Sequence, residues 1–476
     1  MERISVFDMF KIGVGPSSSH TLGPWQAARQ WVNSLIEEQV FDQVKSITVY
    51  LYGSLAKTGI GHGTDIAVLM GLSGENPETI DTSTINSKIE QIKIQKILSF
   101  NQQRNIDFDI EKGVVFLLQE ALPFHANALR FRAELDNRLL KEAIFYSVGG
   151  GFVVKEGEQN QPHKQTVTLP FPCDKTEDLL KHCQTNEISI AEMVWQNELV
   201  WRSPEQIKNG LLKIWQTMLE CVYRGCHTFG ILPGGLEVKR RAKHLHDKLI
   251  KNKTYSNYEE WITAIKNTPV FFDDVLSWVS CFAFAVNEEN AAFGRIVTAP
   301  TNGAAGVIPT VLMYYITLSG KEVGEDEIIK FLSIAGEIGT FFKKGATISA
   351  AMGGCQAEIG VSSAMAAAAL TECLGGTVEQ ALMAAEIAME HHLGMTCDPI
   401  GGLVQIPCIE RNSMGAIKAI TATRIALGTG ADFAKVSLDS VINTMWETAQ
   451  DMNGKYKETS EGGLATNVAF VNLAEC

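Results

Sequence analysis

The sequence predicts two regions of different fold class: an α+β region with a mixed or antiparallel sheet, followed by an all-α helical bundle. In the N-terminal third, short alternating segments are interleaved with a helical pattern. In the C-terminal part, apolar residues recur almost throughout at three- or four-residue spacing. A polar, proline-containing segment separates the two patterns. We therefore expect an α+β domain at 1–160, a linker at 161–186, and an all-α domain with a C-terminal tail at 187–476.

Four segments of the N-terminal region have the alternation of half-buried strands. Ser46–Tyr52 is the clearest, because β-branched and aromatic residues alternate along it. Ala143–Val148 leads into three consecutive glycines, which indicate a turn. Pro24–Glu37 instead has the three- and four-residue spacing of a helix. The other two predicted strands are Val114–Leu118 and Leu129–Leu135.

The C-terminal region contains a succession of predicted helices separated by glycine-rich turns. Several have apolar residues nearly all round, which predicts a bundle with a buried central helix. The predicted helices are Leu211–Tyr223, Asp273–Val286, Glu325–Phe342, Ala357–Leu374, Val378–His391 and Met414–Leu427.

Composition excludes several classes of function. The 476 residues are 45% hydrophobic and 20% charged, as in soluble globular proteins. A net charge of -13 without a long basic run argues against nucleic acid or an anionic membrane as a partner. The first ten residues lack the apolar core of a signal peptide, and the longest apolar stretches are too short to span a bilayer. We expect a cytoplasmic protein.

Three of the ten cysteines are distinguished by flanking glycine or proline. Cys355 follows two glycines at the apparent start of a helix, where a thiol pKa is lowered and the metal-binding thiolate is favoured. Cys397 and Cys408 each lie close to a proline. The spacings of 42 and 11 residues (397 − 355 and 408 − 397) match neither a ferredoxin nor a zinc ribbon. On spacing alone, three unrelated cysteines at turns are the better interpretation.

Longer strings around these cysteines and near the N-terminus change that weighting. The strings are Gly15–Thr21, Gly61–Asp65, Ala299–Gly306, Gly354–Gly360 and Cys397–Asn412. They resemble the signature blocks of bacterial iron–sulfur L-serine dehydratases of the single-chain type, and they occur in both halves of the chain in the family's order. The resemblance implies that Cys355, Cys397 and Cys408 hold a [4Fe-4S] cluster and that L-serine is converted to pyruvate and ammonia.

Three cluster ligands rather than four suit the dehydration of serine. The iron without a protein thiolate can act as a Lewis acid on the substrate hydroxyl and carboxylate. A base must still remove the Cα proton, and histidine is the usual candidate near neutral pH. We favour His62, between two glycines, as the base, with His20 and His125 orienting the substrate or handling the leaving water. All three lie in turns rich in Gly, Ser or Asn, where catalytic residues are common.

Further polar residues are expected to contact the substrate between the two domains. The consecutive hydroxyls of Ser17–Ser19 could bind a carboxylate or cap a helix, and capping is the better interpretation for at least one of them. Asn302 is a turn residue first and a substrate contact second. The expected substrate-binding residues are Ser17, Ser18, Ser19, Thr64, Asn127, Asn302 and Lys343.

The chain ends in a cysteine, Cys476. A terminal cysteine is usually an exposed tail thiol, but the apolar residues before this one could dock on a surface. Single-chain members of the resembled family place such a cysteine in the active site as a fourth ligand of the resting cluster. We expect the same of Cys476, with serine displacing it.

Other classes of function stay open. They are an iron–sulfur hydro-lyase acting on a small hydroxy acid, a cluster-based redox sensor and a zinc-stabilised binding module. A pyridoxal phosphate enzyme is not expected, because no lysine lies in the glycine-rich setting of such a Schiff base. The resemblance further implies a lyase of amino-acid catabolism and gluconeogenesis, with homodimeric assembly.

Overall fold

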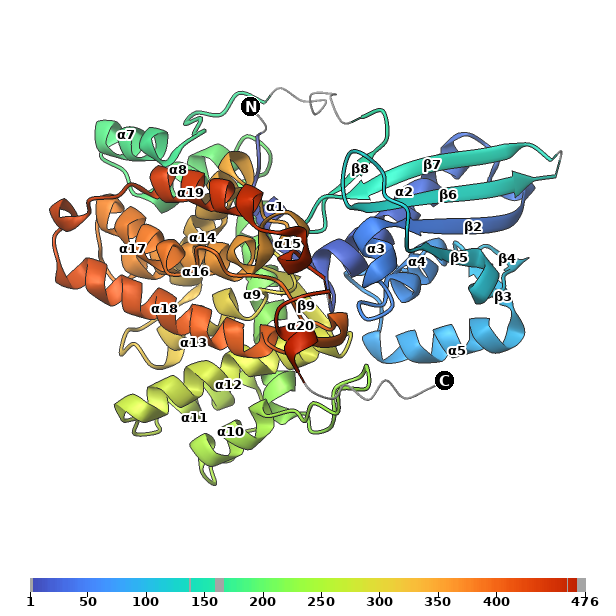
Figure 1. The fold of residues 1–476 in the computed structure, drawn as a ribbon. Helices are drawn as coiled ribbons and strands as arrows, with labels where there is room; N and C mark the ends of the chain where they lie inside the picture. The colour runs from blue at the N-terminus through green and yellow to red at the C-terminus, as the bar shows by residue number, and fades with distance from the viewer. Residues whose placement is uncertain (1–2, 137, 159–166, 460, 469–476) are drawn as a thin grey trace.

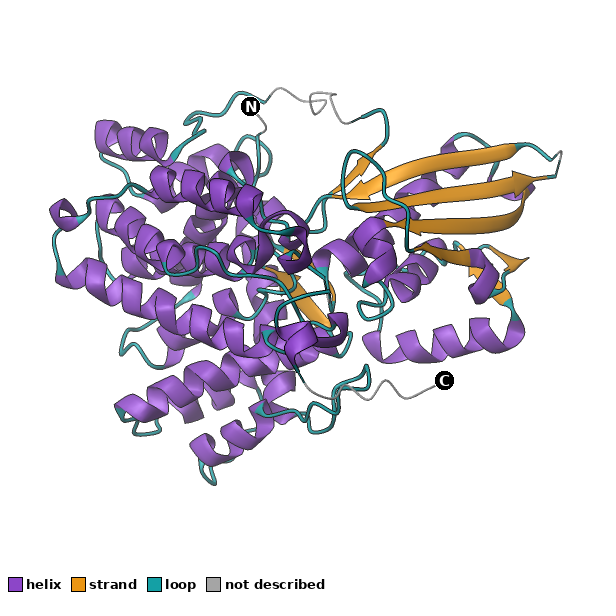
Figure 2. Ribbon diagram, in the orientation of Figure 1, coloured by secondary structure: helices purple, strands orange, loops and turns teal. Residues whose placement is uncertain are grey.

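The computed structural model describes residues 3–136, 138–158, 167–459 and 461–468. A sheet-containing region and a helical region lie side by side in Figure 1, on the right and left of the view. Figure 2 shows the same division, with the long strands gathered on one side and most helices on the other. The predicted fold class is confirmed: an N-terminal region with a mixed sheet precedes a helical region.

The main sheet has five strands in the order β5-β2-β6-β7-β8. Only the β2–β5 pair is parallel, so the sheet is mixed. One face of β2 buries Val44, Val49 and Leu51 in the core of this region, as the alternation predicts. All four predicted strands are present. The strands are β2 (Val44–Tyr52), β5 (Val114–Leu117), β6 (Asn127–Leu135), β7 (Leu140–Ser147) and β8 (Val153–Lys155).

Helices cover the buried face of this sheet. The predicted helix at Pro24–Glu37 is α2, and its tryptophans Trp25 and Trp31 are fully buried. The small hairpin of β3 (Ile97–Phe100) and β4 (Arg104–Asp107) lies beyond the main sheet and was not predicted. The helices are α2 (Gly23–Glu37), α3 (Gly53–Lys57), α4 (Thr64–Leu72), α5 (Ile85–Gln95) and α6 (Ile110–Gly113).

The helical region is built around α16 (Ile359–Cys373). Residues 359–372 of this helix are all buried, and its many alanines allow α13, α14, α17 and α18 to pack closely against it. The predicted buried central helix is therefore present, and so are all six predicted helices. The helices of this region are α7 (Thr176–Asn186), α8 (Ile190–Glu198), α9 (Pro204–His227), α10 (Ala242–Ile250), α11 (Tyr258–Lys266), α12 (Phe272–Ala291), α13 (Val307–Thr317), α14 (Glu325–Gly345), α15 (Ala350–Gly353), α16, α17 (Val378–Glu390), α18 (Cys408–Gly428), α19 (Leu438–Asp451) and α20 (Leu464–Asn467).

The last part of the segment expected to be a linker is helical. Residues 176–186 form α7, which packs against α8, α17 and α19. Its buried side is narrow and is formed by Thr176, Leu179 and Cys183, which explains why a mostly polar sequence hid it. We propose an α+β domain at 1–160 and an all-α domain at 187–476, joined by the segment 161–186, whose last part, α7, packs on the all-α domain.

The N-terminal residues cross from one region to the other. The short helix α1 (Val6–Met9) packs on α14, and Ile4, Phe10 and Ile12 also lie in the core of the helical region. β1 (Lys11–Val14) then pairs antiparallel with β9 (Arg295–Thr298), a strand inside the helical region. This two-stranded ribbon leads the chain directly from the helical core to the serines that follow Gly15.

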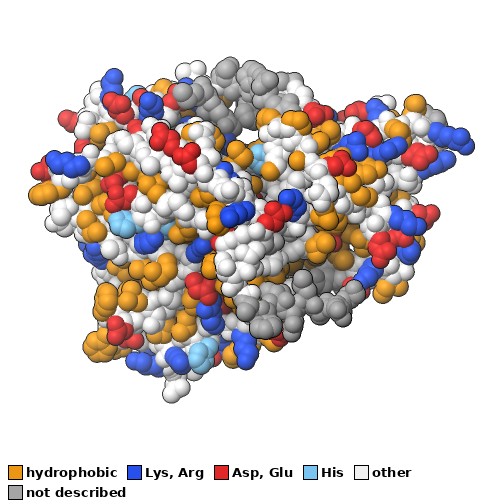
Figure 3. Space-filling model, in the orientation of Figure 1, with side chains coloured by type: hydrophobic (Ala, Val, Ile, Leu, Met, Phe, Trp, Pro, Cys, Tyr) orange, Lys and Arg blue, Asp and Glu red, His pale blue; other side chains and the backbone are white. Residues whose placement is uncertain are grey.

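The surface carries charges of both signs. On the face in Figure 3, basic and acidic side chains are interspersed. None of the described helices combines the length and apolarity needed to cross a bilayer.

Candidate active site

Three structural elements of the helical region bring the predicted cysteines together. Cys355 lies in a single turn of 3₁₀ helix before α16, Cys397 in the extended segment after α17, and Cys408 is the first residue of α18. All three are buried. The Sγ atoms of Cys355 and Cys397 and a carboxylate oxygen of Glu358 lie within 4.8 Å of one another. Cys408 is outside that triplet, but like the other two cysteines it interacts electrostatically with Arg411.

A left-handed glycine shapes the turn that carries Cys355. Gly354 has φ +70°, and a Cβ there would lie 2.7 Å from the carbonyl oxygen of Met395. The next residues hold the same loop: the Gln356 N–H donates to Met395 O at 3.2 Å, and the Gln356 side chain accepts from Gly394 N at 2.9 Å. The turn before α16 is thereby fixed to the loop that leads to Cys397.

Arg411 supplies positive charge beside the thiols. It is held by Thr396 O, to which Nη1 donates at 2.6 Å, and by Asp398, whose Oδ1 lies 3.5 Å from Nη2. A hydrogen bond from Cys397 and the charge of Arg411 outweigh burial and lower the pKa of Cys355 to about 7. Burial raises the pKa of Cys183, a cysteine of the apolar core, to about 12. The surroundings therefore favour a thiolate at Cys355, whereas the hydrogen bond with Cys355 raises the pKa of Cys397, and burial that of Cys408, well above the ordinary value of a thiol.

The donors present fit a metal group held by thiolates. Three buried thiols supply soft ligands, and one half-buried guanidinium supplies partial charge compensation. Burial, together with the nearby Cys355 and Glu458, raises the pKa of Glu358 well above its usual range and so favours the neutral form of this carboxyl. Glu358 was not singled out from the sequence, although it lies in the string Gly354–Gly360.

His20 is completely buried and has partners at both ring nitrogens. It lies in a short π-helical turn, Ser18–Leu22, at the start of α2. Its Nδ1 is 2.9 Å from Ser19 Oγ and 3.2 Å from Glu458 Oε1. Its Nε2 is 3.1 Å from Ser54 Oγ and 3.0 Å from Thr58 Oγ1.

His62 packs against His20. The two ring centroids are 4.5 Å apart. His62 Nδ1 lies 2.9 Å from the carbonyl oxygen of Thr58, which can only accept, so the neutral ring carries its proton on Nδ1 and has a bare Nε2. Burial and the neighbouring His20 lower the pKa of His62 to about 4.

His125 has the opposite tautomer. Its Nδ1 accepts a hydrogen bond from the backbone N–H of Asn127 at 3.0 Å, so the neutral ring carries its proton on Nε2. Burial lowers the pKa of His125, and the charges of Glu458 and His20 act on the same ring. The structure thus brings the three predicted histidines together.

Glu458 links the histidines to the cysteines. It belongs to the segment 453–459, which we call the strap. The N–H of Cys397 donates to Tyr456 O at 2.7 Å, and the N–H of Thr459 donates to Cys397 O at 3.4 Å. Between these two bonds, the Glu458 carboxylate faces His20. No pattern in the sequence pointed to this residue, which lies in a polar stretch.

The predicted substrate contacts have different surroundings. Ser17 caps the π-helical turn, because its Oγ accepts from His20 N at 3.1 Å. Thr64 Oγ1 donates to His20 O at 2.7 Å, which gives it a structural role. Both polar side-chain atoms of Asn127, and Oδ1 of Asn302, are buried without a hydrogen-bond partner among the described residues. Such atoms are suited to a bound polar molecule.

The remaining predicted residues are less closely connected to the site. Ser18 is buried in the same turn as His20. Lys343 lies in the last turn of α14, with Nζ 4.3 Å from the centroid of the Phe152 ring. Cys476 lies outside the described residues.

α18 ties the Asn302 turn to the cysteines. Asn412 accepts from Gly306 N at 3.1 Å and donates to Gly303 O at 2.7 Å and to Cys408 O at 2.9 Å. Both Asn412 and Arg411 lie in the sixteen-residue string Cys397–Asn412, but no role was predicted for either.

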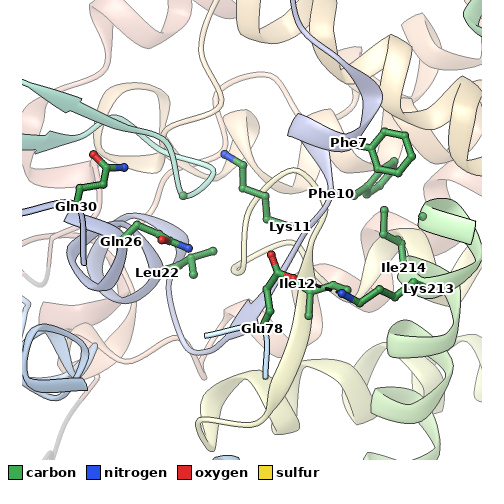
Figure 4. Close-up of a pocket in the computed structure, with 12 residues that line it drawn as sticks. Phe7, Phe10, Lys11, Ile12, Leu22, Gln26, Gln30, Glu78, Lys213 and Ile214 are labelled. Atoms are coloured by element: carbon green, nitrogen blue, oxygen red, sulfur yellow. Dashed lines mark hydrogen bonds and ion pairs between the residues drawn. The ribbon is translucent and has the colours of Figure 1, made fainter. Parts of the chain in front are cut away.

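One pocket adjoins the site and another does not. A cavity of about 390 Å³ is lined by Thr58 and Gly61 from the sheet region and by Gly401 and Leu403 from the helical region. A second, of about 460 Å³, lies between α2, β1 and α9; Figure 4 shows its lining, and none of the predicted site residues is part of it. Neither pocket is lined by a predicted site residue, but the first includes Thr58, whose carbonyl oxygen is bonded to His62.

Comparison with known proteins gives full-length matches. The model of the serine dehydratase beta chain matches residues 5–158, and that of the serine dehydratase alpha chain matches residues 185–465. The L-serine dehydratase of Haemophilus influenzae is 47% identical over 98% of this chain and 99% of its own. That of Streptomyces coelicolor is 48% identical over 99% and 100%. L-serine dehydratase 1 of Escherichia coli K12 is 45% identical over 98% and 99%.

Proposed function

The chain belongs to the serine dehydratase family, and we propose that it is an iron–sulfur enzyme that converts L-serine into pyruvate and ammonia. One observation carries the proposal. Three buried cysteines share one arginine, three buried or half-buried histidines lie close to one another, and the strap is bonded to both groups. An elimination at Cα and Cβ requires a Lewis acid to activate the leaving hydroxyl and a base to take the Cα proton, and these two groups of residues are suited to supply them.

We assign Cys355, Cys397 and Cys408 as the ligands of a [4Fe-4S] cluster. When bound, a cluster with one iron free of protein thiolate supplies a Lewis acid for the hydroxyl and carboxylate of serine. Arg411 offsets the negative charge of the thiolates, and its bond to Thr396 O fixes the Cys397 loop. The unpartnered polar atoms of Asn127 support a substrate position between the cysteines and the histidines.

His62 is assigned as the base that takes the Cα proton. Its Nδ1–H is bonded to Thr58 O, so the bare Nε2 is the atom that accepts the proton. The low pKa keeps Nε2 unprotonated at neutral pH. His125 carries its proton on Nε2 and is suited to donate a hydrogen bond to the substrate oxygens or to the departing water.

Loss of the Cα proton and of the Cβ hydroxyl, as water, leaves 2-aminoacrylate. This enamine tautomerises to the imine, and one water then hydrolyses the imine to pyruvate and ammonia. No oxidant or reductant is consumed, so the balance requires only proton transfer and activation of the leaving group.

The experiment that tests the proposal is an assay of protein purified without oxygen. We expect iron and sulfide in the protein and release of pyruvate and ammonia from L-serine. Alanine at Cys355, Cys397 or Cys408 should remove the cluster and the activity, whereas Cys183→Ala, a buried core cysteine, should keep both. Iron-free protein, or full activity in any of the three variants, would contradict the proposal.

The same assay separates the other candidate functions. Zinc in place of iron would indicate a binding module, and dehydration of a hydroxy acid without ammonia would indicate another hydro-lyase. A redox sensor would tolerate replacement of the histidines. The family resemblance also supports a homodimer, which sedimentation equilibrium would test.

We further propose that Cys476 is the fourth ligand of the resting cluster. In support, the N–H of Leu464, close to the C-terminus, donates at 2.7 Å to Asp398, the neighbour of Cys397. Cys476→Ala should shorten any lag before steady turnover and hasten cluster loss in air. An unchanged lag with unchanged air sensitivity would count against it.

A further inference from the structure

The strap holds Glu458 in a backbone conformation that non-glycine residues rarely adopt. Glu458 has φ +54°, the left-handed region that non-glycine residues rarely occupy. Backbone hydrogen bonds join Cys397 to Tyr456 and to Thr459, and they hold the strap on both sides of Glu458. Such a conformation persists where surrounding contacts over-determine it, and these sites are often functional.

The Glu458 carboxylate is buried and directed at one imidazole. Its Oε1 lies 3.2 Å from His20 Nδ1 and accepts from Ser19 Oγ at 2.9 Å. Its backbone carbonyl accepts from Ser54 Oγ at 3.4 Å. Because a carboxylate can only accept, the pair fixes the proton of His20 on Nδ1 and turns Nε2 toward the hydroxyls of Ser54 and Thr58.

The carboxylate is charged despite its burial. Burial alone would raise its pKa, but the charge and hydrogen bond of His20 lower the pKa of Glu458 to about 2. Its second oxygen, Oε2, has no partner among the described residues. A buried charge of this kind is costly unless it is paired, so His20 and Glu458 constrain each other's position.

The orientation of His20 in turn sets that of His62. The two rings are in contact, with centroids 4.5 Å apart, and both are bonded to Thr58, through its side chain and its carbonyl oxygen respectively. The strap that carries Glu458 is also bonded to the backbone of Cys397. One short segment therefore fixes the histidines relative to a cysteine of the proposed cluster.

From this geometry we propose that Glu458 is a positioning residue for the dehydration: it holds His20, and through His20 the base His62, in place relative to the Cys397 loop. This role rests on the proposed function. It assigns to the strap a task in the reaction that is separate from the cluster ligands and from the C-terminal cysteine.

The test compares Glu458→Gln and Glu458→Asp with a matched control. The control, Glu461→Gln, lies just beyond the strap, where Glu461 forms an exposed pair with Lys57 at 2.9 Å, and it should leave turnover unchanged. In Glu458→Gln we expect kcat for L-serine to fall by roughly 100-fold, with little change in KM and with iron and sulfide content unchanged. Glu458→Asp should recover part of kcat, because it restores the charge.

A double-mutant cycle identifies the route of the effect. If Glu458 acts through His20, the variant carrying both Glu458→Gln and His20→Gln should be no slower than His20→Gln alone. Full additivity, a wild-type kcat in Glu458→Gln, or parallel loss of iron and activity would each overturn the positioning role. Absence of serine turnover in the wild-type protein would instead overturn the proposed function, and this role with it.

Discussion

At the scale of single residues, the chemistry depends on how burial acts on each titratable group. Burial favours the neutral form of both a thiol and an imidazole, yet the results differ across the site. For His62, the proposed base, the neutral form is the useful one, because a base must be unprotonated. For Cys355, a proposed cluster ligand, the useful form is the thiolate, and the hydrogen bond from Cys397 and the charge of Arg411 reverse the effect of burial.

The low pKa of His62 predicts an unusual acid limb in the rate profile. With a pKa of about 4 instead of 6.5, His62 stays neutral as pH falls through the range in which an ordinary histidine would be protonated. We therefore expect kcat/KM for L-serine to be nearly flat from about pH 8 to about pH 5, as far as the base controls it. An anaerobic pH–rate series would measure this, and a midpoint near 6.5 would contradict His62 as the base.

The lowered pKa of His62 also makes the folded protein less stable at acidic pH. The unfolded chain binds a proton at His62 more tightly than the folded protein does, so the folded state loses stability as pH falls from 6.5 toward 4. Above 6.5 the residue is neutral in both states and contributes no pH dependence. His246 and His392, whose pKa values burial also lowers to about 4, act in the same direction.

At the scale of elements, β9 is the strand that fastens the two regions. Besides pairing with β1, it carries Arg295, whose guanidinium donates to Pro77 O at 2.8 Å and to Ile80 O in the sheet region. The backbone carbonyl oxygen of Arg295 accepts a hydrogen bond from the Arg224 guanidinium at 2.9 Å. The ribbon therefore fixes the start of the chain that runs from β1 into the π-helical turn of His20.

Removing that guanidinium should weaken the junction. Arg295→Ala leaves two carbonyl oxygens without their donors, and we expect the free energy of unfolding to fall by about 2 kcal/mol, with a lower kcat for L-serine. Urea unfolding under anaerobic conditions would measure the change. The control is Lys213→Ala at the same junction, where an exposed pair with Glu78 at 3.4 Å should contribute less than about 1 kcal/mol. Equal losses in both variants would contradict the assignment.

The helices and strands also differ in how well the sequence predicted them. α16 was evident because an alanine-rich segment with few polar breaks can only be a buried helix in a chain of this composition. β9 was not evident, because four residues are too few to establish a period and their partner strand lies more than 280 positions away, with Lys11 opposite Thr298. α7 was hidden because only one narrow side of it is buried.

At the scale of the whole molecule, each region has its own hydrophobic core, and the site lies where they meet. Both ends of the described chain cross that boundary. Residues 4–12 begin in the helical core and lead to His20, whereas the strap returns from the helical region to bring Glu458 against the same histidine. The candidate site is thus assembled from segments of both regions.

The amino-acid sequence was enough to predict the fold class and the main strands and helices. Its local patterns record burial, and its longer strings hold the three cysteines and two of the three histidines, His20 and His62. Which groups meet became visible only in the folded chain: Arg411 among the thiols, the tautomers of His62 and His125, and Glu458 beside His20. Periodicity reflects one residue's exposure, whereas a charge pair or a tautomer depends on atoms brought together from distant parts of the chain.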